Sequence, residues 1–165
     1  PTGSTDIRNR GGNLAEPTLQ PGTGALGLVV DAGYDDRAAV AGKELRWFVS
    51  SLWRWNAAGS RGYRIGADWM THAGVHVLLH PRVEYLTQIA VRWRDRDDAG
   101  RTSELVDATG GSVLFISPGI RLELTRDLWL HGYWQGPGYE DVNRLQLTAA
   151  HNLMLGVAYE LRLWN

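Results

Sequence analysis

The sequence has no cysteine, only one lysine and only two phenylalanines among its 165 residues. Without cysteine, disulfide bonds and thiolate metal sites are excluded. An excess of charge is also missing, because 17 Lys and Arg stand against 18 Asp and Glu and the net charge is -1. This balance gives no basis for a basic nucleic-acid surface, so we predict no nucleic-acid partner.

Long hydrophobic runs are absent as well. No apolar stretch approaches the roughly 20 residues of a membrane-spanning helix, and the mean hydropathy is -0.27. These observations exclude a helical membrane protein. They are compatible with a membrane β-barrel, because the polar residues of a barrel lumen lower any hydropathy average.

Aromatic residues are plentiful, with 8 Trp and 6 Tyr in the chain. Both residues favour membrane–water interfaces, where the ring contacts lipid and the polar tip contacts water. A soluble β protein with tryptophan in its core is the alternative, and composition alone does not separate the two.

The strongest pattern is an alternation of apolar and polar residues with a period of two, which predicts β-strands. In the last segment Leu153, Leu155, Val157, Tyr159 and Leu161 alternate with a mixed, partly charged face. Residues 1–23 lack periodicity and are predicted to form an extracellular loop segment, with 24–165 as the β-barrel domain. The predicted strands are 24–35, 44–56, 66–79, 83–95, 112–124, 128–136 and 152–163. Pro118 interrupts the fifth and predicts a bulge or a local edge there.

The connections between these strands alternate in length. Those at 36–42, 80–82 and 125–127 are short, whereas 57–65, 96–111 and 137–151 are long and polar or glycine-rich. Outer-membrane barrels have short turns at the periplasmic end and long loops outside. We therefore predict an all-β, antiparallel, up-and-down transmembrane β-barrel in the bacterial outer membrane. A soluble sandwich or lipocalin-like barrel is the alternative, because alternation does not tell which face points inward.

On the barrel interpretation, the apolar faces carry tryptophans near their ends that resemble an aromatic girdle in contact with outer-membrane lipid. The girdle candidates are Trp47, Trp53, Trp55, Trp69 and Trp93. The opposite faces carry polar and charged residues. The lumen-lining candidates are His72, His76, Glu84, Arg92, Arg121, Glu123, Glu160 and Arg162. The charged members either select solutes by their sign or form a cross-strand ion-pair network that only fills and stiffens the barrel.

Histidines at 72, 76 and 80 share one face of the third strand. Residues four apart on a strand are separated by roughly 13 Å, so no two of them can bind one ion without ligands from neighbouring strands. We predict no metal site and no cofactor. No Gly-x-Ser-x-Gly motif and no glycine-rich phosphate loop before a helix is present, so we predict no catalytic residue and no enzymatic activity.

Several segments resemble a family of bacterial outer-membrane transporters related to the MetA-pathway of phenol degradation. The resemblance is carried by 16–24, 62–66, 109–111, 117–119, 130–135 and 155–159, with Pro137, Tyr139, 142–143 and 145–148. It implies a transmembrane β-barrel, whereas the biochemical activity of the family is mostly unestablished. The resemblance also implies longer chains, with several more strands before the equivalent of Pro1 and an end near Leu161.

Seven predicted strands are an odd number, whereas single-chain bacterial barrels have an even number. We expect the additional strands to come from an absent N-terminal part, so that the chain is the C-terminal portion of a larger barrel. Strands from another chain, or one overlooked strand, are the alternatives. The predicted function is passage of small solutes through a polar lumen. An outer-membrane lipid-modifying enzyme with a Ser/His arrangement and a structural subunit associated with other envelope proteins are the alternatives.

Overall fold

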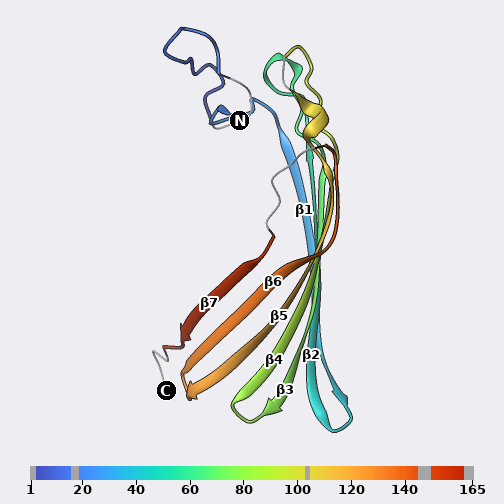
Figure 1. Ribbon diagram of the computed structural model, residues 1–165, viewed down its shortest axis with the longest axis vertical. Coiled ribbons are helices and arrows are strands. Elements are labelled where there is room, and N and C mark those ends of the chain that lie inside the picture. Colours follow the sequence, from blue (N-terminus) through green and yellow to red (C-terminus); the bar gives the residue numbers. More distant parts are fainter. Residues whose placement is uncertain (1–2, 16–18, 103–104, 145–149, 162–165) are drawn as a thin grey trace.

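The computed structural model of the chain describes residues 3–15, 19–102, 105–144 and 150–161. It contains one seven-stranded antiparallel sheet in which every strand pairs with the next one along the chain (Figure 1). The strands are β1 (Gly27–Val40), β2 (Lys43–Asn56), β3 (Asp68–His80), β4 (Val83–Arg94), β5 (Gly111–Thr125), β6 (Leu128–Val142) and β7 (Asn152–Tyr159). Two short 3-10 turns, η2 (Ser60–Gly62) and η3 (Val106–Ala108), lie in the long loops.

The all-β, antiparallel, up-and-down prediction is confirmed. The sheet does not close into a barrel, since β1 and β7 are its two edges. Within the described part of the chain, no helix is long and apolar enough to cross a membrane.

Several predicted strand bounds were wrong. β1 begins at Gly27 and continues to Val40, because a two-residue turn with positive φ at Ala41 (51°) and Gly42 (76°) replaces the predicted seven-residue connection. Such turns match the twist of hairpin strands. β6 continues to Val142, well past the predicted end at 136, although its sequence there is rich in glycine and proline.

Pro118 lies opposite Thr87 of β4 and does not shift the register. On the β6 side, Ile116 pairs with Gly136 and Gly119 pairs with Tyr133, so the register is the same before and after Pro118. The register shifts lie instead between Leu114 and Phe115 and between Glu123 and Thr125. Between Leu114 and Phe115, β6 holds one extra residue, Gly138, so the predicted bulge does not lie at Pro118. Ser117 and Pro118 have no paired residue on β6, so the ladder has a local gap there, as the alternative of a local edge predicted.

The register places most of the apolar residues of the seven strands on one face of the sheet. This apolar face includes the following paired residues: Leu28, Val30, Trp53, Trp55, Trp69, Val75, Ile89, Val91, Trp93, Leu114, Ile116, Leu130, Leu153, Leu155 and Val157. The other face, called the polar face below, includes Asp31, Arg54, Asp68, His72, His76, Glu84, Gln88, Arg92, Ser117, Arg121, Glu123, His131 and Gln135.

The two faces differ in exposure, and the difference tells which way the sheet curves. Trp69 is 53% exposed and Ile89 45% on the apolar face, whereas Leu86 is 2% and Ser117 4% exposed on the polar face. One hollow of about 300 Å³ is lined both by Phe48 of β2 and by residues of β6 and β7. Side chains of distant strands converge over the polar face, so the sheet forms a trough with the polar face inside. The alternation in the sequence did not reveal this direction.

Candidate functional site

The polar face is the candidate site, and its most buried carboxylate lies near the long-loop end. Asp68 of β3 is 4% exposed and lies between arginines of both neighbouring strands. Arg92 donates from Nε to Oδ1 at 2.9 Å and from Nη2 to Oδ2 at 2.8 Å. Arg54 donates from Nη2 to Oδ2 at 2.8 Å. This bidentate and bridged geometry fixes three strands to one another through charge-assisted hydrogen bonds.

A second buried carboxylate, Asp97, organises the loops above that end of the sheet. Its Oδ2 accepts a hydrogen bond from the Tyr63 hydroxyl at 2.6 Å, and its Oδ1 accepts from the Gly66 amide at 2.9 Å. Arg94 of β4 donates to Oδ1 at 2.8 Å, and the Asp97 amide donates to the Thr109 hydroxyl at 2.9 Å. Asp97 thereby joins the loop after β2 to the loop after β4.

Aromatic rings lie over glycines in the middle of the polar face. Phe48 pairs with Gly74, and a Cβ at Gly74 would lie 2.5 Å from Phe48 Cε1. Tyr133 pairs with Gly119, where a Cβ would lie 2.6 Å from Tyr133 Cδ1. The rings cover backbone that a side chain would otherwise shield, which is the arrangement known as aromatic rescue of glycine. Both rings also line the hollow of about 300 Å³ over the polar face.

Polar amides cross the same level of the trough. Gln88 Nε2 lies 2.9 Å from His72 Nδ1, and Gln135 Nε2 donates to Ser117 Oγ at 3.3 Å. Asn152 of β7 donates to Gln135 Oε1 at 2.9 Å. Among the hydrogen bonds of the described residues, none joins a serine to a histidine.

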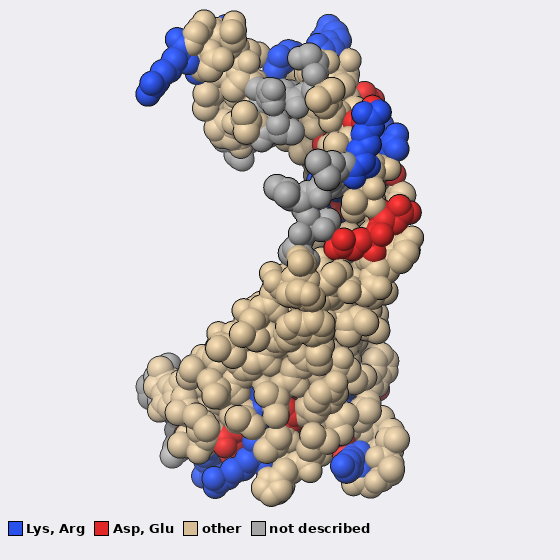
Figure 2. Space-filling model, in the orientation of Figure 1, with Lys and Arg blue, Asp and Glu red and all other residues tan. Residues whose placement is uncertain are grey.

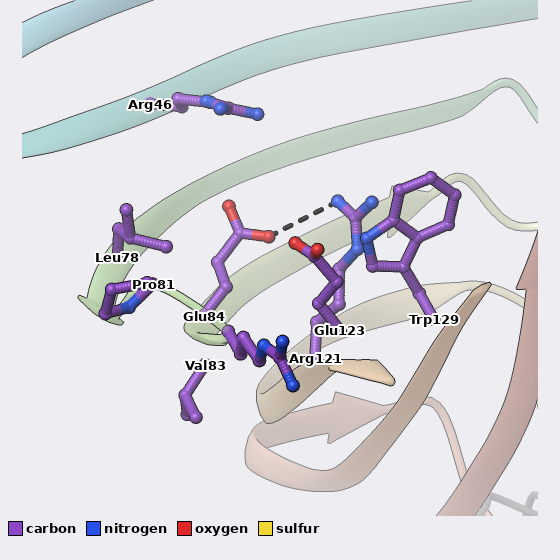
Figure 3. A pocket seen from close by; sticks show the side chains of 9 residues that line it. Arg46, Leu78, Pro81, Val83, Glu84, Arg121, Glu123 and Trp129 are labelled. Atoms are coloured by element: carbon purple, nitrogen blue, oxygen red, sulfur yellow. Dashed lines mark hydrogen bonds and ion pairs between the residues drawn. The ribbon is translucent and has the colours of Figure 1, made fainter. Parts of the chain in front are cut away.

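A mixed-charge pocket of about 280 Å³ lies near the short-turn end (Figure 3). Arg121 Nη1 lies 3.3 Å from Glu84 Oε2, and its guanidinium carbon lies 4.9 Å from the centroid of the Trp129 ring. His76 Nδ1 lies 3.6 Å from Glu84 Oε1. Arg46 reaches the pocket from β2, on the other side from Arg121. The pocket therefore presents both signs of charge to any solute in the trough.

The structure brings most of the predicted lumen-lining residues together. His72, His76, Glu84, Arg92, Arg121 and Glu123 all lie on the polar face. Glu160 follows the end of β7 and is exposed, so its placement on a strand was wrong. Arg162 lies outside the described residues.

The girdle candidates lie on the apolar face. Trp53, Trp69 and Trp93 are paired directly across β2, β3 and β4, and Trp55 lies one step closer to the long loops. Trp47 lies toward the short-turn end, 5.4 Å from the ring of Tyr34. Tyr85 and Tyr159 lie at this second end too, although they were not among the predicted girdle residues.

Charged side chains are excluded from the apolar face between these two aromatic levels. Along β4, Tyr85 and Trp93 enclose Thr87, Ile89 and Val91 over roughly 26 Å of strand. Within the described strands, the charged residues of the apolar face are Asp36, which pairs with Trp47 at one aromatic level, and Lys43 and Asp141 at strand ends. Figure 2 shows a broad uncharged zone with charges gathered above and below it.

Sequence reasoning missed Asp68 and Phe48 as site residues. Asp68 was visible as the acidic first residue of a strand, but its two arginine partners follow only from the register of three strands. Phe48 was missed because an apolar residue on a mainly polar face gives little signal. Among the described residues, no three His, Asp or Glu side chains are grouped to hold a metal ion.

Comparison with known proteins identifies no relative. No protein-family model, no curated protein and no solved structure matches the chain. The resemblance to outer-membrane transporters remains a prediction.

Proposed function

We propose that the chain forms part of the wall of an outer-membrane β-barrel through which small solutes diffuse. The observation that carries this proposal is the direction of curvature. A soluble barrel encloses its apolar face and exposes its polar face. Here the polar face lines the trough and the apolar face, with Trp69 53% exposed, lies outside. Lipid is the solvent that favours an exposed face of this kind.

Two further features support a location in lipid. The uncharged zone lies between two aromatic levels, as in the lipid-facing band of membrane barrels. The strands β1 to β6 have 12 to 15 residues, which meets the roughly 9–11 residues that a tilted strand needs to cross a bilayer.

The mechanism of passage follows from the polar face. Solutes would pass the Asp68 cluster, the hollow lined by Phe48 and the mixed-charge pocket at Glu84 and Arg121. Because these carboxylates are paired with arginines, the wall is polar without a strong excess of one sign. We therefore expect weak ion selectivity and passage of small polar solutes.

Planar-bilayer recording on the purified full-length protein tests the proposal. We expect discrete conductance steps, with flotation of proteoliposomes confirming that the protein is inserted. Inserted protein that leaves the bilayer sealed would refute passage of solutes.

The two unpaired edges favour a second candidate, a structural subunit of an envelope complex. It predicts a stable complex with other envelope proteins and no conductance from that complex. Purification from native outer membranes, followed by recording, separates the two functions.

A further inference from the structure

β1 is an edge strand that is exposed along its whole length. All of its residues from Gly27 to Val40 are exposed, and only one side of its backbone pairs with a strand, β2. In the proposed membrane location, the other row of N–H and C=O groups would have no water to bind. The edge therefore requires another strand beside it.

The polar face of β1 carries two carboxylates that have no ion-pair partner among the described residues, although Arg37 and Arg46 line the same hollow as one of them, Asp35. Asp31 and Asp35 lie on this face opposite Leu52 and Phe48, and neither forms an ion pair or a side-chain hydrogen bond in the described part of the chain. By contrast, every carboxylate of β2, β3 and β4 has an arginine partner. These carboxylates are Glu44, Asp68 and Glu84.

We infer that β1 pairs with a strand whose polar face carries arginine or lysine opposite Asp31 and Asp35 and whose other face is apolar. This inference rests on the proposed barrel. It specifies the charges that face each other at the seam, by which we mean the line along which β1 pairs with the additional strand. The two cations would be four residues apart on the partner strand, because residues on paired strands face each other one to one. The apolar face of the partner would extend that of β1, where Leu28 is 52% and Val30 is 51% exposed.

A second copy of this chain does not supply that strand. The polar face of β1 holds one cation, Arg37, so no register of β1 against β1 puts a cation opposite both aspartates. The register that aligns Asp31 with Asp35 would bring like charges directly opposite each other, which destabilises a sheet. The other free edge belongs to β7, whose polar face consists of Asn152, Met154, Gly156 and Ala158. Over Asn152–Tyr159 that face has no cation, so pairing with these residues of another copy leaves both aspartates unpaired.

Two synthetic peptides test the chemistry of the seam. Each has 12 residues, valine on one face, and either two arginines or two glutamates four residues apart on the other. We expect the arginine peptide to bind the chain in detergent micelles about tenfold more tightly than the glutamate peptide, from two favourable cross-strand pairs. Fluorescence anisotropy of labelled peptide gives the affinities.

Charge variants of the chain provide the matched controls. Replacing both Asp31→Asn and Asp35→Asn should abolish the preference, and Asp31→Arg with Asp35→Arg should reverse it. Far-UV circular dichroism confirms that these variants of exposed positions keep their strands. Equal binding of both peptides to the unaltered chain would overturn the inference.

The position of the seam is tested by cross-linking, since the chain has no cysteine of its own. A cysteine-bearing arginine peptide should form a disulfide with the Ala32→Cys variant on β1 and much less with Val157→Cys on β7. Preferential cross-linking to β7, or disulfide-linked dimers of the Ala32→Cys variant alone, would overturn the inference. The peptide assay in micelles does not depend on conductance. A sealed bilayer would therefore refute the passage of solutes without contradicting the inferred pairing of β1.

Discussion

The ring of Phe48 lies over Gly74, the residue directly opposite it on β3. A Cβ at position 74 would approach two ring carbons, Cε1 at 2.5 Å and Cζ at 2.8 Å, and the backbone oxygen of Thr87 at 3.0 Å. The absence of a side chain at one position thus sets the orientation of a ring at another. Because this ring lines the hollow over the polar face, the pair links sheet packing to the lining of the proposed passage.

The variant Gly74→Ala should therefore destabilise the protein by about 1–3 kcal/mol, the usual cost of overpacking. Urea unfolding in detergent, followed by tryptophan fluorescence, measures the free energy of unfolding. Gly33→Ala is the matched control, because a Cβ there would meet Ser50 Cβ at an ordinary 3.5 Å. Equal losses in both variants would contradict the role of the ring contact.

The division of each strand into an apolar and a polar face could be predicted from the sequence. Alternation is a local property, so Trp69 and His72 were assigned to opposite faces without knowledge of the neighbouring strands. The existence of all seven strands could be predicted for the same reason. The length of β6 could not be predicted, because Gly136, Pro137 and Gly138 have the composition of a loop and extend as a strand only through pairing with β5.

The site was predicted in part for a related reason. Glu84 and Arg121 were placed on one face by alternation, but their ion pair depends on the β4–β5 register. The hub at Asp68 needs the registers of two strand pairs at once, and no period in the sequence encodes them. The direction of curvature is set by packing over the whole sheet and could not be predicted either.

Asp68→Asn should destabilise the sheet by about 2–3 kcal/mol, because it weakens charge-assisted hydrogen bonds to a buried acceptor. Glu44→Gln is the control, since its partner Arg46 lies 3.1 Å away and both side chains are about half exposed. Pairs of that kind contribute roughly 0–1 kcal/mol. Unfolding in urea measures the free energy of unfolding of both variants. Similar losses would show that burial does not strengthen the hydrogen bonds of Asp68.

Tyr63→Phe should loosen the long loops without unfolding the sheet. The lost hydroxyl donates to the buried Asp97 carboxylate at 2.6 Å, a bond worth about 1.5–3 kcal/mol. Hydrogen exchange should become faster at amides of residues 95–102 and 105–110. Tyr139→Phe, at an exposed ring on β6, should leave those amides unchanged. Unchanged exchange in both variants would rule out Asp97 as the connection between the loops.

Glu84→Gln should shift ion selectivity toward anions. The substitution removes the carboxylate that lies 3.3 Å from Arg121 and 3.6 Å from His76, so the pocket gains net positive charge. Reversal potentials in a potassium chloride gradient measure the shift. Glu160→Gln, beyond the end of β7, should not change the potential. A reversal potential that does not respond at position 84 would place this pocket outside the ion path.

Ile89→Lys separates a membrane wall from a soluble sheet. Ile89 is 45% exposed on the apolar face and lies midway between Tyr85 and Trp93 along β4. A lysine at the middle of a lipid-facing strand costs about 2–4 kcal/mol, whereas an exposed surface substitution in water changes stability by about 0.5 kcal/mol or less. Urea titration of the protein folded into vesicles measures the difference. Ser50→Lys, on the polar face, should reduce the stability far less, because the lysine would extend into the water-filled lumen. If the two lysine variants are equally stable in vesicles, the apolar face does not contact lipid and the barrel proposal is wrong.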